Sequence, residues 1–227
     1  MILKNNHIDF ASEITKKKIK YLIHFTPTIN LYSILEQKKI MSRSILESLD
    51  IEQYDILDYV QFTDKIRYDD KRYINLSVSS PNTFLLSKFM EKTSNNMVIK
   101  WCILKIKPSY IYDSDTLFSV TNAASTAAKN QYGISGDIET FKMLFADRLN
   151  INTFNGTRNI VRDNISDKYP TDIQAEILVK EIIPTSSIIS VCFQTNNDLA
   201  EAKAAMSNFD TSTFKIEPKI FSPSRRI

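Results

Sequence analysis

Glycine is nearly absent from this chain, and its scarcity limits the folds that the chain can adopt. Only three of the 227 residues are glycine, at Gly133, Gly136 and Gly156. The dinucleotide-binding turn G-x-G-x-x-G and the P-loop G-x-x-x-x-G-K-[ST] both require glycines at fixed spacings, because their backbone approaches a phosphate closely. Neither pattern occurs in the sequence. Any nucleotide that this chain binds must therefore be held in another way.

The segments with helical or strand periodicity follow one another irregularly. Helical spacing or composition is found at 9–20, 27–37 (with Asn30 as a possible N-cap), 82–92, 121–130, from about Asp137, and 196–209. Strand-like apolar runs are found at 21–26, 72–79, 97–107, 177–183, 188–193 and 214–221. Residues 150–170 are polar and predict a loop. Helices gathered early and strand pairs late favour an α+β fold over a doubly wound parallel sheet.

Composition fits a single domain over residues 1–227, with a core at about 20–221. The chain is 43% hydrophobic, which is enough to bury a core. Its net charge of +3 is compatible with nucleic-acid binding without demonstrating it. No signal-peptide region and no run of 18 apolar residues is found, so we expect a soluble, cytoplasmic protein without a membrane partner.

The cysteine and histidine content argues against a metal site. Cys102 and Cys192 each lie inside an apolar run, which predicts buried free thiols. The two cysteines and two histidines have no zinc-ligand spacing, so no metal is expected.

Three polar residues in or beside apolar strands are candidates for a site. His24, within LIHFT, is either a core histidine bonded to backbone or a ligand-binding residue at a strand end. Glu176 is either an edge carboxylate paired with a lysine or a catalytic group. Gln174 lies two positions before it, and in a strand the two side chains would share one face. That shared face favours the catalytic interpretation.

Four sequence blocks resemble the DarT family of bacterial toxins, which ADP-ribosylate bases in DNA. The blocks stand in family order and span roughly residues 20 to 193. They are LIHFTPTINLYSIL, RYINLSVSSPN, WCILKIKPSYIY followed by TNAAS, and YPTDIQAEILV. The LSVSSPN and TNAAS segments are closer to the guanine-modifying branch. The Y-V-P-F-Y-F-x-x-R-S-P-M-L-Y block of the thymine-modifying branch is absent.

This resemblance implies an ADP-ribosyltransferase fold, with two small packed antiparallel or mixed sheets and flanking helices around an NAD cleft. It implies NAD as co-substrate, and a macrodomain antitoxin as partner in a toxin–antitoxin system. Glu176 would be the catalytic glutamate and Gln174 would position the substrate. The residues implied to bind NAD are His24, Phe25, Thr26, Ser33 and Arg67. Arg67 is also implied to be catalytic, and Arg72 is the alternative candidate for its position.

The chemistry agrees with the residue types. Cleavage of the nicotinamide glycosidic bond builds positive charge on the ribose, which a fixed carboxylate stabilises. An arginine can hold the diphosphate bidentately in place of a glycine-rich loop.

The resemblance of the LSVSSPN and TNAAS segments implies guanine as the acceptor base. The DNA is predicted to be single-stranded, because a base inside a duplex stack cannot be attacked. The candidates for gripping the strand are the basic residues Lys16–Lys18, Lys20, Arg158 and Arg162 and the rings of Tyr132, Phe154 and Tyr169. Two alternatives stay open: an RNA-modifying enzyme of the same fold, and a nucleic-acid-binding relative without activity.

Overall fold

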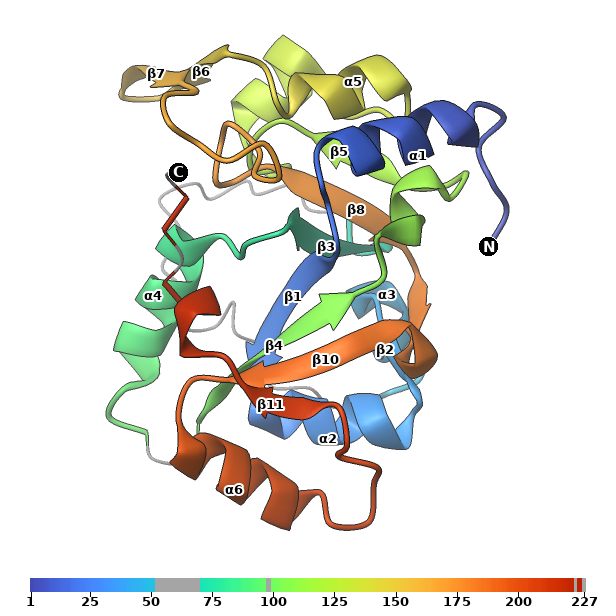
Figure 1. The fold of residues 1–227 in the computed structure, drawn as a ribbon, viewed down its shortest axis with the longest axis vertical. Coiled ribbons are helices and arrows are strands. Elements are labelled where there is room, and N and C mark those ends of the chain that lie inside the picture. The colour runs from blue at the N-terminus through green and yellow to red at the C-terminus, as the bar shows by residue number, and fades with distance from the viewer. Residues whose placement is uncertain (52–69, 97–98, 223, 226–227) are drawn as a thin grey trace.

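A seven-stranded mixed sheet forms the centre of the protein (Figure 1). The computed structural model describes residues 1–51, 70–96, 99–222 and 224–225. The strands follow the order β11-β10-β4-β1-β3-β8-β5, and all neighbours are antiparallel except β10 and β11. Their bounds are β1 (Leu22–Pro27), β3 (Tyr73–Val78), β4 (Trp101–Ile106), β5 (Leu117–Ser119), β8 (Glu176–Lys180), β10 (Ile188–Phe193) and β11 (Phe214–Ile216).

The sheet divides into two halves at β3. The C-terminal end of β3 pairs with β1 through Leu22↔Val78 and Ile23↔Ser77 alone. Its N-terminal part, from Tyr73 to Leu76, pairs with β8 instead. Strands β1 and β3 therefore part beyond this short contact. The predicted α+β class is confirmed, and the two predicted small sheets are the two halves that meet at β3.

Two short ribbons complete the strands. One joins β2 (Lys39–Met41) to β9 (Ile182–Pro184), and the other is the hairpin of β6 (Arg148–Thr153) and β7 (Gly156–Val161). The predicted strand 177–183 is two strands, because Glu181 adopts a φ of 61° between β8 and β9. The prediction of a loop at 150–170 is wrong for its first part, which forms the β6–β7 hairpin.

Helices cover both faces of the sheet. Alternate residues of β1 point to opposite faces, and they pack with helices in two different apolar clusters. Leu22 packs in the larger cluster, with side chains of α1, α2, α5 and α6. Ile23 packs in the smaller one, against Leu86 and Phe89 of α4. The helices are α1 (His7–Lys16), α2 (Thr28–Glu36), α3 (Arg43–Ser48), α4 (Thr83–Thr93), α5 (Ile138–Met143) and α6 (Asn196–Ala205), with short turns η2 (Pro108–Tyr112), η3 (Ala128–Tyr132), η4 (Thr185–Ser187) and η5 (Pro218–Ile220).

Several local predictions need correction. Asn30 lies inside α2 rather than capping it, since the helix begins at Thr28 after Pro27. Within 121–130 the helical structure covers only residues 126–130, the last three of which begin η3. The last predicted strand, 214–221, ends at Ile216. The two cysteines are free and buried, as predicted, and burial raises the pKa of Cys192 to about 11.

Candidate active site

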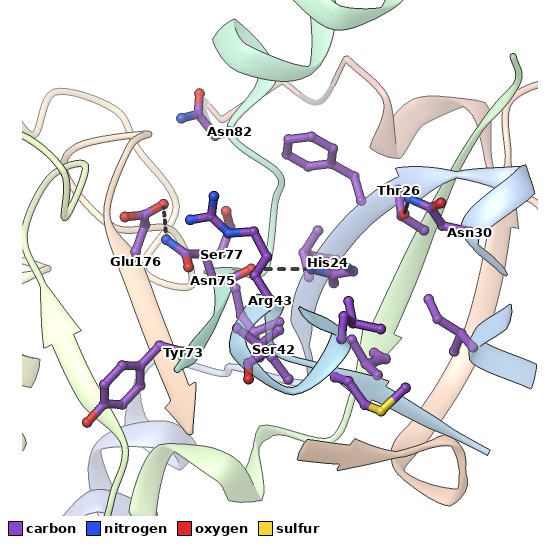
Figure 2. A pocket seen from close by; sticks show the side chains of 18 of the residues that line it. His24, Thr26, Asn30, Ser42, Arg43, Tyr73, Asn75, Ser77, Asn82 and Glu176 are labelled. Atoms are coloured by element: carbon purple, nitrogen blue, oxygen red, sulfur yellow. Dashed lines mark hydrogen bonds between the residues drawn. The ribbon is translucent and has the colours of Figure 1, made fainter. Parts of the chain in front are cut away.

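A cleft of about 230 Å³ lies where β1 and β3 part (Figure 2). Side chains from β1, α2, the β2–α3 segment, β3 and α4 line it, and Glu176 at the start of β8 closes one end. The cleft therefore follows from the topology, because the two halves of the sheet share only two residue pairs between β1 and β3.

His24 lies on β1 at the cleft, and its ring is oriented by the backbone of β3. Its Nδ1 is 3.3 Å from the carbonyl oxygen of Asn75. A carbonyl oxygen only accepts hydrogen bonds, so Nδ1 carries the proton and donates. Burial lowers the pKa of His24 below its ordinary value of 6.5, against the smaller opposing effect of this hydrogen bond. The imidazole is therefore neutral at pH 7, with Nε2 as an acceptor.

The polar face of β3 forms the wall between His24 and Glu176. Ile74, Leu76 and Val78 are buried in the larger apolar cluster. Alternate residues of a strand point to opposite faces, so Asn75 and its neighbours two positions away face the cleft. Tyr73, Asn75 and Ser77 all line it.

Two donors orient the Glu176 carboxylate. The Asn75 side-chain amide donates to Oε1 at 3.2 Å, and the backbone N–H of Ala123 donates to Oε2 at 2.7 Å. Each oxygen thus receives one hydrogen bond from a different segment of the chain. Asn75 was not among the predicted site residues. The polar positions that alternate with apolar ones in RYINLSVS were the signal that could have identified it.

The prediction for Arg67 stays untested, while its rival Arg72 lies away from the cleft. Arg67 lies outside the described residues. Arg72 does not line the cleft; its guanidinium pairs with Asp70 through Nη2–Oδ2 at 2.7 Å, with its side chain 62% exposed. Arg43, at the start of α3, lines the cleft, and its guanidinium extends toward the space between Glu176 and His24 (Figure 2).

The structure brings most of the other predicted NAD-binding residues together. Phe25, Thr26 and Ser33 all line the cleft with His24 and Glu176. Gln174 does not share a strand face with Glu176, because it lies in a turn that ends before β8 begins. Its backbone N–H donates to Oδ1 of Asp172 at 3.0 Å, and it is not among the described residues that line the cleft.

Several of the residues predicted to contact nucleic acid form bonds within the protein. Arg158 pairs with the buried Asp172 at 2.5 Å, and Arg162 donates to the carbonyl oxygens of Tyr169 and Ser166. Tyr169 is buried, and the hydroxyl of Tyr132 is bonded to Asn150. Phe154 is fully exposed. The predicted basic residues that end and follow α1 do not line the cleft; they are Lys16, Lys17, Lys18 and Lys20.

The described part of the chain contains neither a candidate metal cluster nor a candidate membrane-spanning helix. No three or more His, Cys, Asp or Glu side chains there are grouped so that they could hold a metal ion. No helix in that part is long and apolar enough to cross a bilayer.

A family model described as "ssDNA thymidine ADP-ribosyltransferase, DarT" matches residues 23–222. The chain belongs to the DarT family. It is thereby an NAD-dependent ADP-ribosyltransferase, with NAD as co-substrate. The family resemblance that the LIHFTPTINLYSIL and YPTDIQAEILV blocks indicated is confirmed. No curated protein sequence matches the chain.

Solved DarT structures share the fold at low sequence identity. Thermosipho africanus DarTG in complex with ADP-ribose has a TM-score of 0.59 and 18% identity, over 91% of this chain and 52% of that one. Thermus sp. 2.9 DarT with carba-NAD+ has a TM-score of 0.57 and 13% identity, over 88% of this chain and 96% of that one. The same DarT with ADP-ribosylated single-stranded DNA has a TM-score of 0.54 and 11% identity, over 89% and 96%. The chain thus spans about half of the Thermosipho chain and nearly all of the Thermus one.

The guanine prediction is wrong. The DarT family model that covers most of the chain names thymidine as the modified nucleoside. The LSVSSPN and TNAAS segments were therefore a poor guide to the base. In the structure these segments carry structural and site roles instead. Asn82 caps α4 by accepting from the Leu85 N–H, and Ala123 holds Glu176.

Proposed function

We propose that this protein transfers ADP-ribose from NAD+ to a thymidine base of single-stranded DNA, with Glu176 as the catalytic carboxylate. The observation that carries the proposal is the carboxylate itself, which is held by two hydrogen bonds at the end of a cleft that His24 and Arg43 also line. Family membership supports both the reaction and the acceptor base.

The chemistry of the cleft suits a dinucleotide with hydroxyls and a diphosphate. His24 offers Nε2 as an acceptor for a ribose hydroxyl, because the ring proton is on Nδ1, which donates to the carbonyl oxygen of Asn75. Arg43 supplies a planar cation that can bind two phosphate oxygens at once. Asn30 and Ser33 of α2 and Thr26 of β1 add neutral polar groups to the lining. Side chains thus replace the glycine-rich loop that the sequence lacks.

Glu176 acts at the reacting carbon. The bond between C1′ of the ribose and the nicotinamide nitrogen breaks, nicotinamide leaves as a neutral molecule, and positive charge develops on the ribose. The carboxylate stabilises that charge more strongly in the transition state than in the ground state. Because Asn75 and Ala123 fix both oxygens in advance, little reorganisation is needed during the reaction.

The acceptor step completes the transfer. Within a nucleoside, thymine carries one ring N–H, at N3, and a bond from N3 to C1′ releases that proton. Glu176 is the carboxylate in the described lining of the cleft that can accept it. Single-stranded DNA is the proposed substrate because a stacked and paired thymine would expose no N3.

Mass spectrometry of oligonucleotides after incubation with NAD+ tests this function. A DNA oligonucleotide that contains thymidine should gain one ADP-ribose, localised to thymidine after nuclease digestion. A matched DNA oligonucleotide without thymidine, a duplex and an RNA of the same sequence should stay unmodified. ADP-ribose on the RNA alone or on another base would overturn the proposed acceptor. NAD+ consumption without any modified nucleic acid would overturn the proposed function.

A toxin role follows from this chemistry as part of the proposal. Modified bases block templates, so expression of the protein alone should arrest growth, and co-expression of a macrodomain that removes the modification should restore it. An E176Q variant (Glu176→Gln) should not arrest growth at matched expression. Growth arrest by that variant would contradict a role through ADP-ribosylation.

A further inference from the structure

Four lysines lie in the short segment that joins the first helix to the first strand. They are Lys16, Lys17, Lys18 and Lys20, in the run KKKIK at 16–20, which we call the basic link. Helix α1 ends at Lys16, and β1 begins at Leu22. The family model begins at residue 23, so the basic link lies outside the part of the chain that this model matches. Family membership therefore does not explain it.

The backbone of the basic link is fixed by hydrogen bonds. The Lys18 N–H donates to the carbonyl oxygen of Thr15 at 3.0 Å. The Ile19 N–H donates to the carbonyl oxygen of Ile14, also at 3.0 Å. These two bonds, with Lys18 at a φ of 56°, form a Schellman motif at the end of α1. Ile14 and Ile19 are buried in the larger apolar cluster. The link therefore presents its lysines from an ordered backbone.

The first two lysines of the link have contacts within the protein. Lys16 is 3.8 Å from Glu13, but its side chain is 71% exposed, so this ion pair is weak. The Nζ of Lys17 lies over the ring of Phe145, 5.1 Å from its centre. The dipole of α1 favours cations in its last turn, which accounts for Lys16.

The other two lysines have no such explanation. Lys18 and Lys20 are exposed, and neither side chain forms an ion pair or a hydrogen bond within the part of the chain that the structure describes. Lys20 also lies beyond the end of the helix, where the dipole has little effect. No Asp or Glu occurs between Glu13 and Glu36 in the sequence. The link is thus a local excess of positive charge that is open to a polyanion.

The basic link leads directly into a wall of the cleft. In Figure 1 the chain passes from the end of α1 into β1. Ile23 and His24 of β1 line the cleft. Lys20 precedes His24 by four residues, which is about 13 Å of extended chain. A DNA strand with one base in the active site could therefore reach the link within a few nucleotides.

We propose that the basic link is a second DNA-binding site, which binds phosphates of the strand beyond the acceptor thymidine. A lysine ammonium is a compact point charge that binds phosphate without reading the base. The site would thus add affinity for longer strands of any sequence, while the cleft selects the acceptor. This inference rests on the proposed function for its substrate, but binding at the link can be measured without transfer.

The double variant K18Q/K20Q tests the proposal, because it removes the two lysines without partners. K107Q/K203Q is the matched control, since Lys107 and Lys203 are exposed lysines on other elements. K18R/K20R keeps both charges. Fluorescence anisotropy over a salt series measures binding of labelled DNA oligonucleotides of about 4 and about 16 nucleotides, the range of single-strand site sizes. The KM for each oligonucleotide and nicotinamide release without DNA are measured in parallel.

The long oligonucleotide should reveal the second site. For K18Q/K20Q the slope of log K against log salt should become shallower by about 1.4, because each lost phosphate contact removes about 0.7. Its KM for the long oligonucleotide should rise, while kcat and nicotinamide release without DNA stay unchanged. The short oligonucleotide should bind K18Q/K20Q and wild type equally. K18R/K20R and K107Q/K203Q should behave as wild type.

Three results would overturn the proposal. They are a wild-type slope and KM in K18Q/K20Q, an equal loss in K107Q/K203Q, and an equal loss with the short oligonucleotide, which would place the effect at the cleft. The proposed function fails separately. If K18Q/K20Q loses affinity for the long strand but wild type never modifies DNA, the link stands and the proposed function falls. If both proteins modify thymidine with the same KM, the proposed function stands and this inference falls.

Discussion

His24 and Asn75 illustrate how far single residues could be predicted. The HFT block identified His24 from sequence, but its tautomer depends on a carbonyl oxygen 51 positions away. Asn75 and Glu176 are 101 positions apart, and only the pairing of β3 with β8 brings them together. Sequence motifs thus predicted the site residues that lie inside family blocks. The hydrogen-bond partners of those residues could be identified only from the folded structure.

The lowered pKa of His24 predicts a pH-dependent stability. In the unfolded chain the imidazole titrates near its ordinary value of 6.5, whereas in the folded protein it titrates lower. The unfolded state therefore binds more protons as the pH falls through 6.5, and the free energy of unfolding falls with it. The stabilisation is fully present above this range and is lost below it.

Thermal unfolding of wild type and H24Q between about pH 7.5 and pH 5 measures this effect. The Tm of wild type should fall more steeply toward low pH than that of H24Q, because glutamine does not titrate. Parallel Tm curves for the two proteins would contradict the lowered pKa.

Arg43 is predicted to hold the diphosphate of NAD. Arg43→Ala should weaken NAD+ binding by about 1.5–3 kcal/mol, the usual size of a charge-assisted hydrogen bond. Arg72→Ala is the control, because that guanidinium is paired with Asp70 away from the cleft. It should change binding by no more than about 0.5 kcal/mol. Calorimetry that showed the larger loss for R72A would remove Arg43 from this role.

At the level of elements, the β6–β7 hairpin was missed because its apolar pattern is short. Within β6 only Leu149 and Ile151 are buried, too few for a clear alternation. The Asn155–Gly156 pair was the available hairpin signal. The strands with longer apolar runs, such as β4 and β10, were predicted within a few residues, because burial on both faces leaves a strong pattern.

The ion pair between Arg158 and Asp172 should stabilise the segment before β8. Arg158→Met leaves the buried carboxylate of Asp172 without its cation, and the free energy of unfolding should drop by roughly 2–4 kcal/mol. The double variant R158M/D172N should recover much of this loss, since an amide needs no counter-charge. Urea unfolding measures both. A change within about 0.5 kcal/mol for R158M would show that the pair contributes little.

At the scale of the whole molecule, the cleft is a product of sheet topology. The sequence predicted the α+β class and the order of most elements. The register in which β1 pairs with β3 could not be predicted from the sequence of either strand. That register alone decides where the two halves part and which side chains face each other. The single domain over 1–227 stays a prediction.

The most direct test of Glu176 as the catalytic carboxylate is the rate of nicotinamide release from NAD+ by E176Q. Glutamine keeps the size of the side chain and removes its charge, so the rate should fall about 100- to 1000-fold while NAD+ binding is retained. Glu181→Gln is the control, because Glu181 is an exposed carboxylate just beyond the same strand. This variant should release nicotinamide at the wild-type rate. Near-normal release by E176Q would contradict the assignment of Glu176.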